Sequence, residues 1–122
     1  MWIYYDTKTG NVQRFVEKLR ELREWKLEKI SPGLHIRQPG HLITFTTRFG
    51  EVPESTIAFV EGNASYIKSV SSSGNRNWGR NFALAADKIS VQLGVPVALK
   101  FELSGTNKDV NTFIQEIEQF II

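Results

Sequence analysis

The sequence has no cysteine among its 122 residues, and this absence excludes disulfides, thiol nucleophiles and thiolate ligation of metals or iron–sulfur clusters. Any redox chemistry must therefore come from a bound cofactor. Long apolar runs are also missing, since none approaches the roughly 20 residues that cross a bilayer. Residues 1–6 lack the basic and apolar segments of a secretory signal. We therefore expect a cytoplasmic protein without a membrane partner.

A large excess of charge of one sign is missing as well. The chain has 15 Lys and Arg residues against 13 Asp and Glu residues, which gives a formal net charge of +2. After residue 12, Arg14 and Lys18 alternate with glutamates such as Glu17, a pattern typical of a solvated, ion-paired helix face. No basic stripe carries stacking aromatic residues, so the sequence predicts no nucleic-acid partner.

Catalytic and metal-binding motifs are equally scarce. The histidines, His35 and His41, lie in or beside the Pro- and Gly-rich segment 31–40, without a carboxylate pattern that completes a triad. No His-x-x-x-His motif is present, so we expect no metal site. The first apolar run ends in a single Asp6, whereas a phosphoacceptor domain needs an acidic cluster to hold Mg²⁺.

Apolar runs alternate with helical patterns, and this alternation favours a parallel sheet covered on both faces. The expected strands are residues 2–5, 25–30, 42–46, 66–72 and 97–103. The first expected helix follows Asn11, and the second covers residues 53–62 with Ile57 and Val60 pointing inward. The third covers residues 81–93, with Gly94 as its C-terminal stop. The last begins at Thr106, which forms a capping box with Asp109, and it packs through Val110, Phe113, Ile114, Ile117 and Ile121.

This order of elements predicts an α/β fold with a single domain over residues 1–122. The arrangement that it suits is the flavodoxin-like doubly wound five-stranded parallel sheet, with strand order 2-1-3-4-5 and helices on both faces. In such folds, ligands bind beyond the carboxyl ends of the strands. The loops at that edge are therefore the candidate site.

The first of these loops joins the first strand to the first helix and is rich in hydroxyl groups. It consists of Thr7, Lys8, Thr9, Gly10 and Asn11. The first N–H groups of a helix have no carbonyl partner within it, and the positive end of the helix dipole lies at the same place. A phosphate fits such a junction. The alternative is a Thr/Asn helix cap that binds no ligand.

Two further loops emerge at the same edge and carry aromatic residues and glycines. They contain Thr46, Thr47, Arg48, Phe49 and Gly50 in one loop and Ser73, Gly74, Asn75, Asn77, Trp78 and Gly79 in the other. Trp78 and Phe49 are placed to sandwich a flat heteroaromatic ring. A phosphate at one end and a planar ring at the other describe a mononucleotide. Trp78 as an aromatic that caps the core, and Gly50 as a simple turn residue, remain open alternatives.

Several motifs together resemble the NrdI proteins, which are small flavodoxin-like partners of class Ib ribonucleotide reductase. The motifs are Thr9-Gly10-Asn11 with Arg14-Phe15-Val16, Phe49-Gly50-Glu51-Val52-Pro53, Ser73-Gly74-Asn75-Arg76-Asn77-Trp78-Gly79 with Asn81-Phe82, and Lys100-Phe101-Glu102-Leu103-Ser104-Gly105-Thr106. The resemblance extends from residue 5 to residue 110, except for the poorly matched segment 22–40. Arg80 departs from the family pattern, in which an acidic residue is common at this place.

The resemblance implies bound flavin mononucleotide (FMN), with its phosphate held by Thr7, Lys8, Thr9, Gly10, Asn11 and Val12. It places the loop 46–51 over the flavin N5 edge, where Gly50 would tune the redox chemistry, and Trp78 on the ring. In the family, the reduced flavin reacts with O2 to give an oxidant. That oxidant activates the dimanganese–tyrosyl radical centre of the small reductase subunit, which is the implied partner.

The charges of the candidate loops are compatible with this chemistry. Cationic side chains at Lys8, Arg48, Arg76 and Arg80 outnumber the carboxylates of Asp6 and Glu51. Nearby cations favour an anion such as the fully reduced flavin. Two alternatives remain: a generic flavodoxin-type electron carrier or FMN reductase, and a non-redox regulatory domain that binds a phosphorylated ligand.

Overall fold

The computed structural model describes the backbone of residues 1–121 and the side chains of residues 1–120, and it contains one parallel sheet with the order β2-β1-β3-β4-β5. The strands are β1 (Trp2–Tyr5), β2 (Lys26–Lys29), β3 (Gly40–Phe45), β4 (Ile67–Gly74) and β5 (Val97–Glu102). The α-helices are α1 (Asn11–Leu22), α2 (Glu54–Asn63), α3 (Leu84–Leu93) and α4 (Asn107–Glu118), and the 3₁₀ helices are η1 (Ala64–Tyr66), η2 (Arg76–Asn81) and η3 (Gln119–Ile121). The predicted topology is confirmed.

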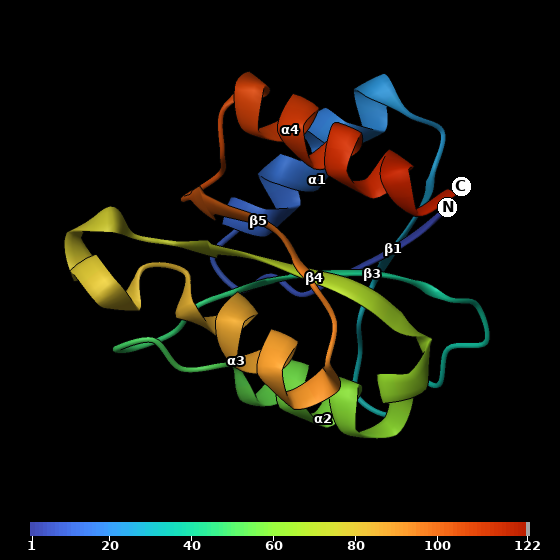
Figure 1. Cartoon of the computed structure of the whole chain (residues 1–122), viewed down its shortest axis with the longest axis horizontal. Coiled ribbons are helices and arrows are strands. Elements are labelled where there is room, and N and C mark those ends of the chain that lie inside the picture. The colour runs from blue at the N-terminus through green and yellow to red at the C-terminus, as the bar shows by residue number, and fades with distance from the viewer. Residues whose placement is uncertain (122) are drawn as a thin grey trace.

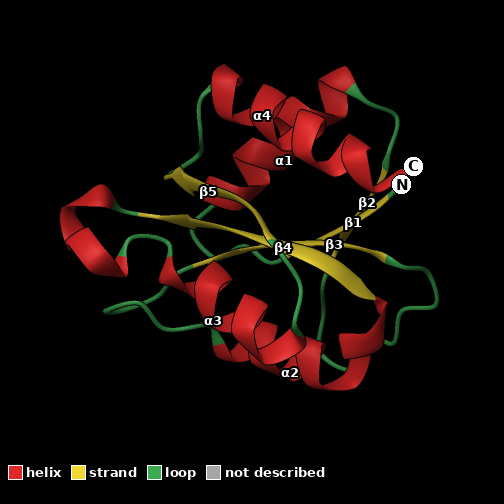
Figure 2. Ribbon diagram, in the orientation of Figure 1, coloured by secondary structure: helices red, strands yellow, loops and turns green. Residues whose placement is uncertain are grey.

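Helices cover both faces of the sheet, as Figures 1 and 2 show. Helices α1 and α4 lie on one face and α2 and α3 on the other, so each face has its own apolar core. No helix within the described residues is long and apolar enough to cross a membrane.

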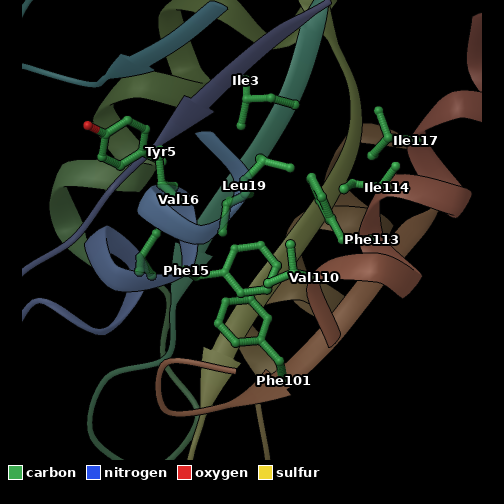
Figure 3. Packing of buried hydrophobic residues seen from close by; sticks show 12 residues of the cluster. Ile3, Tyr5, Phe15, Val16, Leu19, Phe101, Val110, Phe113, Ile114 and Ile117 are labelled. Atoms are coloured by element: carbon green, nitrogen blue, oxygen red, sulfur yellow. The ribbon is translucent and has the colours of Figure 1, made fainter. Parts of the chain in front are cut away.

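The core under α1 and α4 is built around three phenylalanines (Figure 3). Phe15 stacks on Phe101 with 4.2 Å between ring centroids, and Phe113 meets Phe15 edge-on at 5.6 Å. A Cβ on Gly105 would lie 2.8 Å from Phe15 Cδ2, so the chain after β5 passes very close to this cluster. The packing thus holds the start of α1 and the loop after β5 together.

The core on the opposite face corrects one expectation about α2. Ile57, predicted to point inward, is 41% exposed, whereas Phe59 and Val60 are buried. The helix begins at Glu54 and therefore turns Thr56, Phe59, Val60 and Asn63 toward the sheet, at the i, i+3, i+4 and i+7 positions of one face. Ile57 lies one residue further round, toward solvent.

The third helix is shorter than predicted. Residues 76–81 form η2, and α3 begins only at Leu84, because Ala83 has a left-handed φ of +49° and Phe82 has a non-helical ψ of 118°. Ser72 fixes this break, since its Oγ donates to Ala83 O at 2.7 Å and accepts from Ala86 N at 3.1 Å. Gly94 ends the helix with a φ of +68°, as predicted.

The last helix begins as predicted. Thr106 Oγ1 accepts from Asp109 N at 3.1 Å, and Thr106 N donates to Asp109 Oδ2 at 2.8 Å, which completes the capping box. The residues Val110, Phe113, Ile114 and Ile117 are buried in the core. The predicted contact of the Ile121 side chain lies outside the described residues.

Candidate functional site

Four loops meet at the carboxyl edge of the sheet, where β1, β3, β4 and β5 all end because the strands are parallel. The loops after β3 and β4 project to the left in Figure 1. The first three loops were predicted from the sequence to form the site. The fourth, residues 103–106, follows β5 and was not predicted to take part.

The loop between β1 and α1 presents a series of backbone donors. Before it, Asp6 N donates to Ile43 O, and after it, Gln13 N donates to Thr7 Oγ1 and Arg14 N to Gly10 O. Within the described part of the chain, the six backbone N–H groups of residues 7–12 have no protein acceptor. Gly10 has a φ of +92°, a conformation that favours glycine. The arrangement is a cradle for an anion.

Asp6 supports this loop from behind. Its side chain is 6% exposed, and Oδ2 accepts from Ser55 Oγ at 2.5 Å and from Thr56 Oγ1 at 2.6 Å. Thr56 also bonds to Thr44 on β3 at 2.7 Å. The carboxylate therefore joins the end of β1 to the start of α2 and fixes the base of the first loop.

The loop after β3 is a tight hairpin. Thr47 and Glu51 exchange two backbone hydrogen bonds, and Gly50 at the turn has a φ of +99°. A Cβ on Gly50 would lie 2.9 Å from Leu84 Cδ2, so only glycine fits without a shift. Phe49 at the tip is 82% exposed. The loop thus presents backbone groups and one aromatic side chain at the site.

The loop after β4 places its tryptophan beside Phe49. Asn75 Oδ1 accepts from Asn77 N at 2.9 Å and starts η2, which carries Trp78. The Trp78 and Phe49 ring centroids lie 6.4 Å apart, with planes tilted by 42°. A sandwiched ring needs parallel planes about 7 Å apart, twice a van der Waals contact. The structure therefore brings the two rings side by side as a tilted pair.

Glycines and serines at the end of β4 set the shape of the third loop. A Cβ on Gly74 would lie 2.4 Å from Ala83 N, so the strand end and the start of α3 touch through backbone atoms. Ser73 Oγ donates to Leu103 O at 2.5 Å, and Thr46 Oγ1 accepts from Ala85 N at 3.3 Å. A Cβ on Gly79 would have no described atom within 4 Å, so this glycine lies open.

The fourth loop, after β5, joins the site through contacts distant in sequence. Ser104 Oγ accepts from Arg14 Nε at 2.8 Å and donates to Asn11 Oδ1 at 3.0 Å. Lys18 Nζ donates to Gly105 O at 2.7 Å. Arg14 and Ser104 were not predicted as site residues, because no local pattern links positions 90 residues apart.

Two cavities lie on either side of the first loop. One, of about 480 Å³, is lined by Thr7 and Lys8 and by residues of the segment 45–55. The other, of about 610 Å³, is lined by Asn11 and Arg14 and by residues of the segment 102–109. Both volumes are within the range of small-molecule sites. An anion in the cradle would thus have room for an attached group.

The charge at this edge is mixed, because cations and carboxylates both line the two cavities. Arg48 pairs with Glu51 at 3.4 Å, and Arg76 Nε lies 3.9 Å from Glu102 Oε1, while the Arg76 guanidinium also lies 4.5 Å from the Phe82 ring centroid. These pairs are exposed and therefore weak. The described residues include no group of three or more His, Asp or Glu side chains arranged for a metal ion.

The sheet order, the anion cradle and the glycine-rich aromatic loops together define a flavodoxin-like protein. The family model described as NrdI flavodoxin-like matches residues 3–115. The chain therefore belongs to the NrdI flavodoxin-like family.

Relatives and solved structures agree with this assignment. Protein NrdI of Bacillus licheniformis is 52% identical over 121 residues, which cover 98% of this chain and 88% of the relative. The SPbeta prophage-derived protein NrdI of Bacillus subtilis is 45% identical over 114 residues, covering 93% and 88%. A short-chain flavodoxin associated with a non-canonical PDU bacterial microcompartment shares the fold with a TM-score of 0.68 at 17% identity, covering 98% and 95%. A Streptococcus pneumonia flavodoxin has a TM-score of 0.69 at 20% identity, covering 98% and 96%.

Proposed function

We propose that this protein binds FMN at the carboxyl edge of its sheet. The observation that carries the proposal is the cradle of six backbone N–H groups at residues 7–12, which suits a phosphate. The adjoining cavities and the open edge beside Trp78 suit the rest of the cofactor. The residues proposed to hold it are Thr7, Lys8, Thr9, Gly10, Asn11, Val12, Thr46, Thr47, Arg48, Phe49, Gly50, Ser73, Gly74, Asn75, Asn77, Trp78 and Gly79.

Each loop has a distinct task in this proposal. The cradle binds the phosphate, and the Trp78 face covers the flavin ring. Gly50 offers its peptide groups to the N5 edge without a side chain in the way. Lys8, Arg48 and Arg80 add positive potential, which stabilises negative charge on the cofactor. Bound and reduced, FMN supplies electrons to O2.

We further propose that the oxidant produced in this way activates the dimanganese–tyrosyl radical centre in the small subunit of class Ib ribonucleotide reductase. Membership of the NrdI family supports this partner. The proposed role implies a cytoplasmic protein. The exposed loops that carry Phe49 and Trp78 lie at the edge where a partner would meet the cofactor.

The test has two stages. An absorption spectrum of the purified protein should show a bound flavin after incubation with FMN and removal of the excess. The reduced protein is then mixed with the cognate small subunit, Mn²⁺ and O2, and tyrosyl radical is measured by electron paramagnetic resonance. Radical should form only when this protein is present.

Other outcomes would point to other functions. Rapid oxidation of reduced nicotinamide by the protein alone would indicate an FMN reductase, and electron transfer without radical formation would indicate a generic carrier. A colourless protein that is stabilised only by a different phosphate compound would indicate a regulatory domain.

A further inference from the structure

Arg14 lies against the phosphate cradle in a fixed orientation. Its Nε donates to Ser104 Oγ at 2.8 Å, and its Nη2 donates to Asn11 Oδ1 at 2.6 Å. The third nitrogen, Nη1, is 2.8 Å from the position of a Cβ on Gly10. Within residues 1–121 it has no protein acceptor. Two nitrogens of the guanidinium thus anchor it, and the third is left beside the loop that presents the backbone donors.

The orientation is supported from both ends of the chain. Ser104 also bonds to Asn11 Oδ1, so Arg14, Asn11 and Ser104 form a closed triangle of hydrogen bonds. Lys18 Nζ holds the Ser104 loop through Gly105 O. An arginine fixed in this way loses little further side-chain entropy when it meets an anion. The charge is therefore preorganised beside the cradle.

A guanidinium at this place treats two flavins differently. FMN ends in a phosphate that carries close to two negative charges at pH 7, whereas riboflavin ends in a neutral hydroxyl group. Hydrogen bonds between an arginine and a phosphate are charge-assisted and about twice as strong as neutral ones. The neutral hydroxyl gains almost nothing from the positive charge. The flavin ring and ribityl chain are identical in the two ligands.

We propose that Arg14 is the residue by which this site selects phosphorylated flavin over unphosphorylated flavin. The proposal rests on the proposed function, because it assigns Arg14 to the phosphate end of the same ligand. Arg14 adds a full charge to the partial charges of the backbone N–H groups. It acts on ligand choice and not on the redox step.

The test compares the affinities of Arg14→Gln and the wild-type protein for FMN and for riboflavin, measured by quenching of flavin fluorescence. We expect the dissociation constant for FMN to rise roughly 10-fold or more and that for riboflavin to change by less than about 2-fold. The matched control is Arg20→Gln, which removes the same charge from the same helix. Arg20 is exposed, and among the described side chains its ion pair is with Glu17, at 3.4 Å, so both affinities should stay unchanged.

A second variant separates the charge from its orientation. Ser104→Ala keeps the Arg14 charge but removes one of its anchors, and we expect a smaller loss of FMN affinity, about 3-fold, again without an effect on riboflavin. Raising the salt concentration should weaken FMN binding to the wild type more than to Arg14→Gln, because the variant lacks the charge that salt screens.

The outcomes that overturn the proposal are distinct. Equal losses of affinity for both flavins in Arg14→Gln would show that Arg14 only shapes the loop, and unchanged affinities for both would show that it takes no part in binding. A wild-type protein that binds neither flavin would refute the proposed function itself. The wild-type measurement alone would show that result, so it can be told apart from a failure of the Arg14 proposal.

Discussion

His41 is a buried histidine at the end of the sheet opposite the site. It is 3% exposed, and its Nδ1 lies 2.7 Å from Ser69 Oγ. Burial, the N-terminal amine and Lys68 lower the pKa of His41 from 6.5 to about 4. The sequence predicted no catalytic triad around His41, and its place far from the site agrees with a structural role. The sequence could not predict the lowered pKa of His41, because it depends on how deeply the folded chain buries the start of β3.

The depressed pKa predicts a loss of stability in acid. Above pH 6.5 the histidine is neutral in both states. As the pH falls from 6.5 to 4 the unfolded chain binds a proton that the folded protein refuses, so the free energy of unfolding falls by on the order of 3 kcal/mol. Urea denaturation at pH 6.5 and at pH 4 should show a smaller fall in the free energy of unfolding for His41→Gln than for the wild-type protein. The control is His35→Gln, the same substitution at an exposed histidine.

Gly50 tests the proposed role of the loop after β3. Its φ of +99° and the nearby Leu84 mean that Gly50→Val must move the turn. If the Gly50 peptide bonds to the flavin, the reduction potential of bound FMN should shift by roughly 30 mV or more, the equivalent of one charge-assisted hydrogen bond for two electrons. Spectroelectrochemical titration measures it.

A control for Gly50→Val must impose similar backbone strain away from the site. Gly33 has a φ of +77°, and no described atom lies within 4 Å of an added Cβ, so Gly33→Val strains a turn in the loop 30–39. Its bound flavin should keep the wild-type potential. Unchanged potentials in both variants would contradict the role of Gly50.

At the scale of elements, sequence patterns predicted what local forces decide. The five strands appeared within a few residues of their expected bounds, and the Thr106–Asp109 capping box formed as expected. The start of α3 was wrong by three residues, since Ala83 is held out of the helix by contacts with Ser72 and Gly74 on β4. Those contacts cross between elements and leave no local periodicity. The same reason explains why the Arg14–Ser104 contact was missed.

The loop 30–39 between β2 and β3, for which the sequence pattern predicted no element, is tied to α2 by the Asn63 side chain. Asn63 is 3% exposed; its Oδ1 accepts from Ile36 N, and its Nδ2 donates to Leu34 O and Phe59 O, all at 2.9 Å. Ile36 itself is buried. The asparagine replaces the regular backbone bonds that a loop lacks, which fixes a segment with no strand or helix of its own.

Asn63→Ala should therefore loosen this loop. The buried Ile36 N–H loses its acceptor, and we expect the free energy of unfolding to fall by about 2 to 3 kcal/mol. Hydrogen exchange at the Ile36 amide should become faster. Asn111→Ala, at an exposed position of α4, should change stability by less than about 0.5 kcal/mol. Slow exchange at Ile36 in Asn63→Ala would show that other contacts hold the loop.

At the scale of the whole molecule, the candidate site draws on nearly the full length of the chain. The loops that form it are residues 7–12, 46–51, 73–79 and 103–106, and the strands between them are held by cores on both faces. The topology could be predicted from sequence because parallel strands bring their loops to one edge. The tilt of Phe49 against Trp78 could not, because it depends on how the tips of two separate loops pack together.

Because the loops of the site are brought together only in the folded chain, a ligand that bridges them should stabilise the whole fold. At FMN concentrations 100-fold above its dissociation constant, linkage gives about 2.7 kcal/mol, which should raise the melting temperature by roughly 10 °C in differential scanning calorimetry. Inorganic phosphate can occupy only the cradle, and riboflavin only the remainder, so each alone at the same concentration should give a smaller rise. A rise with phosphate equal to that with FMN would mean that the Trp78 edge contributes no binding energy.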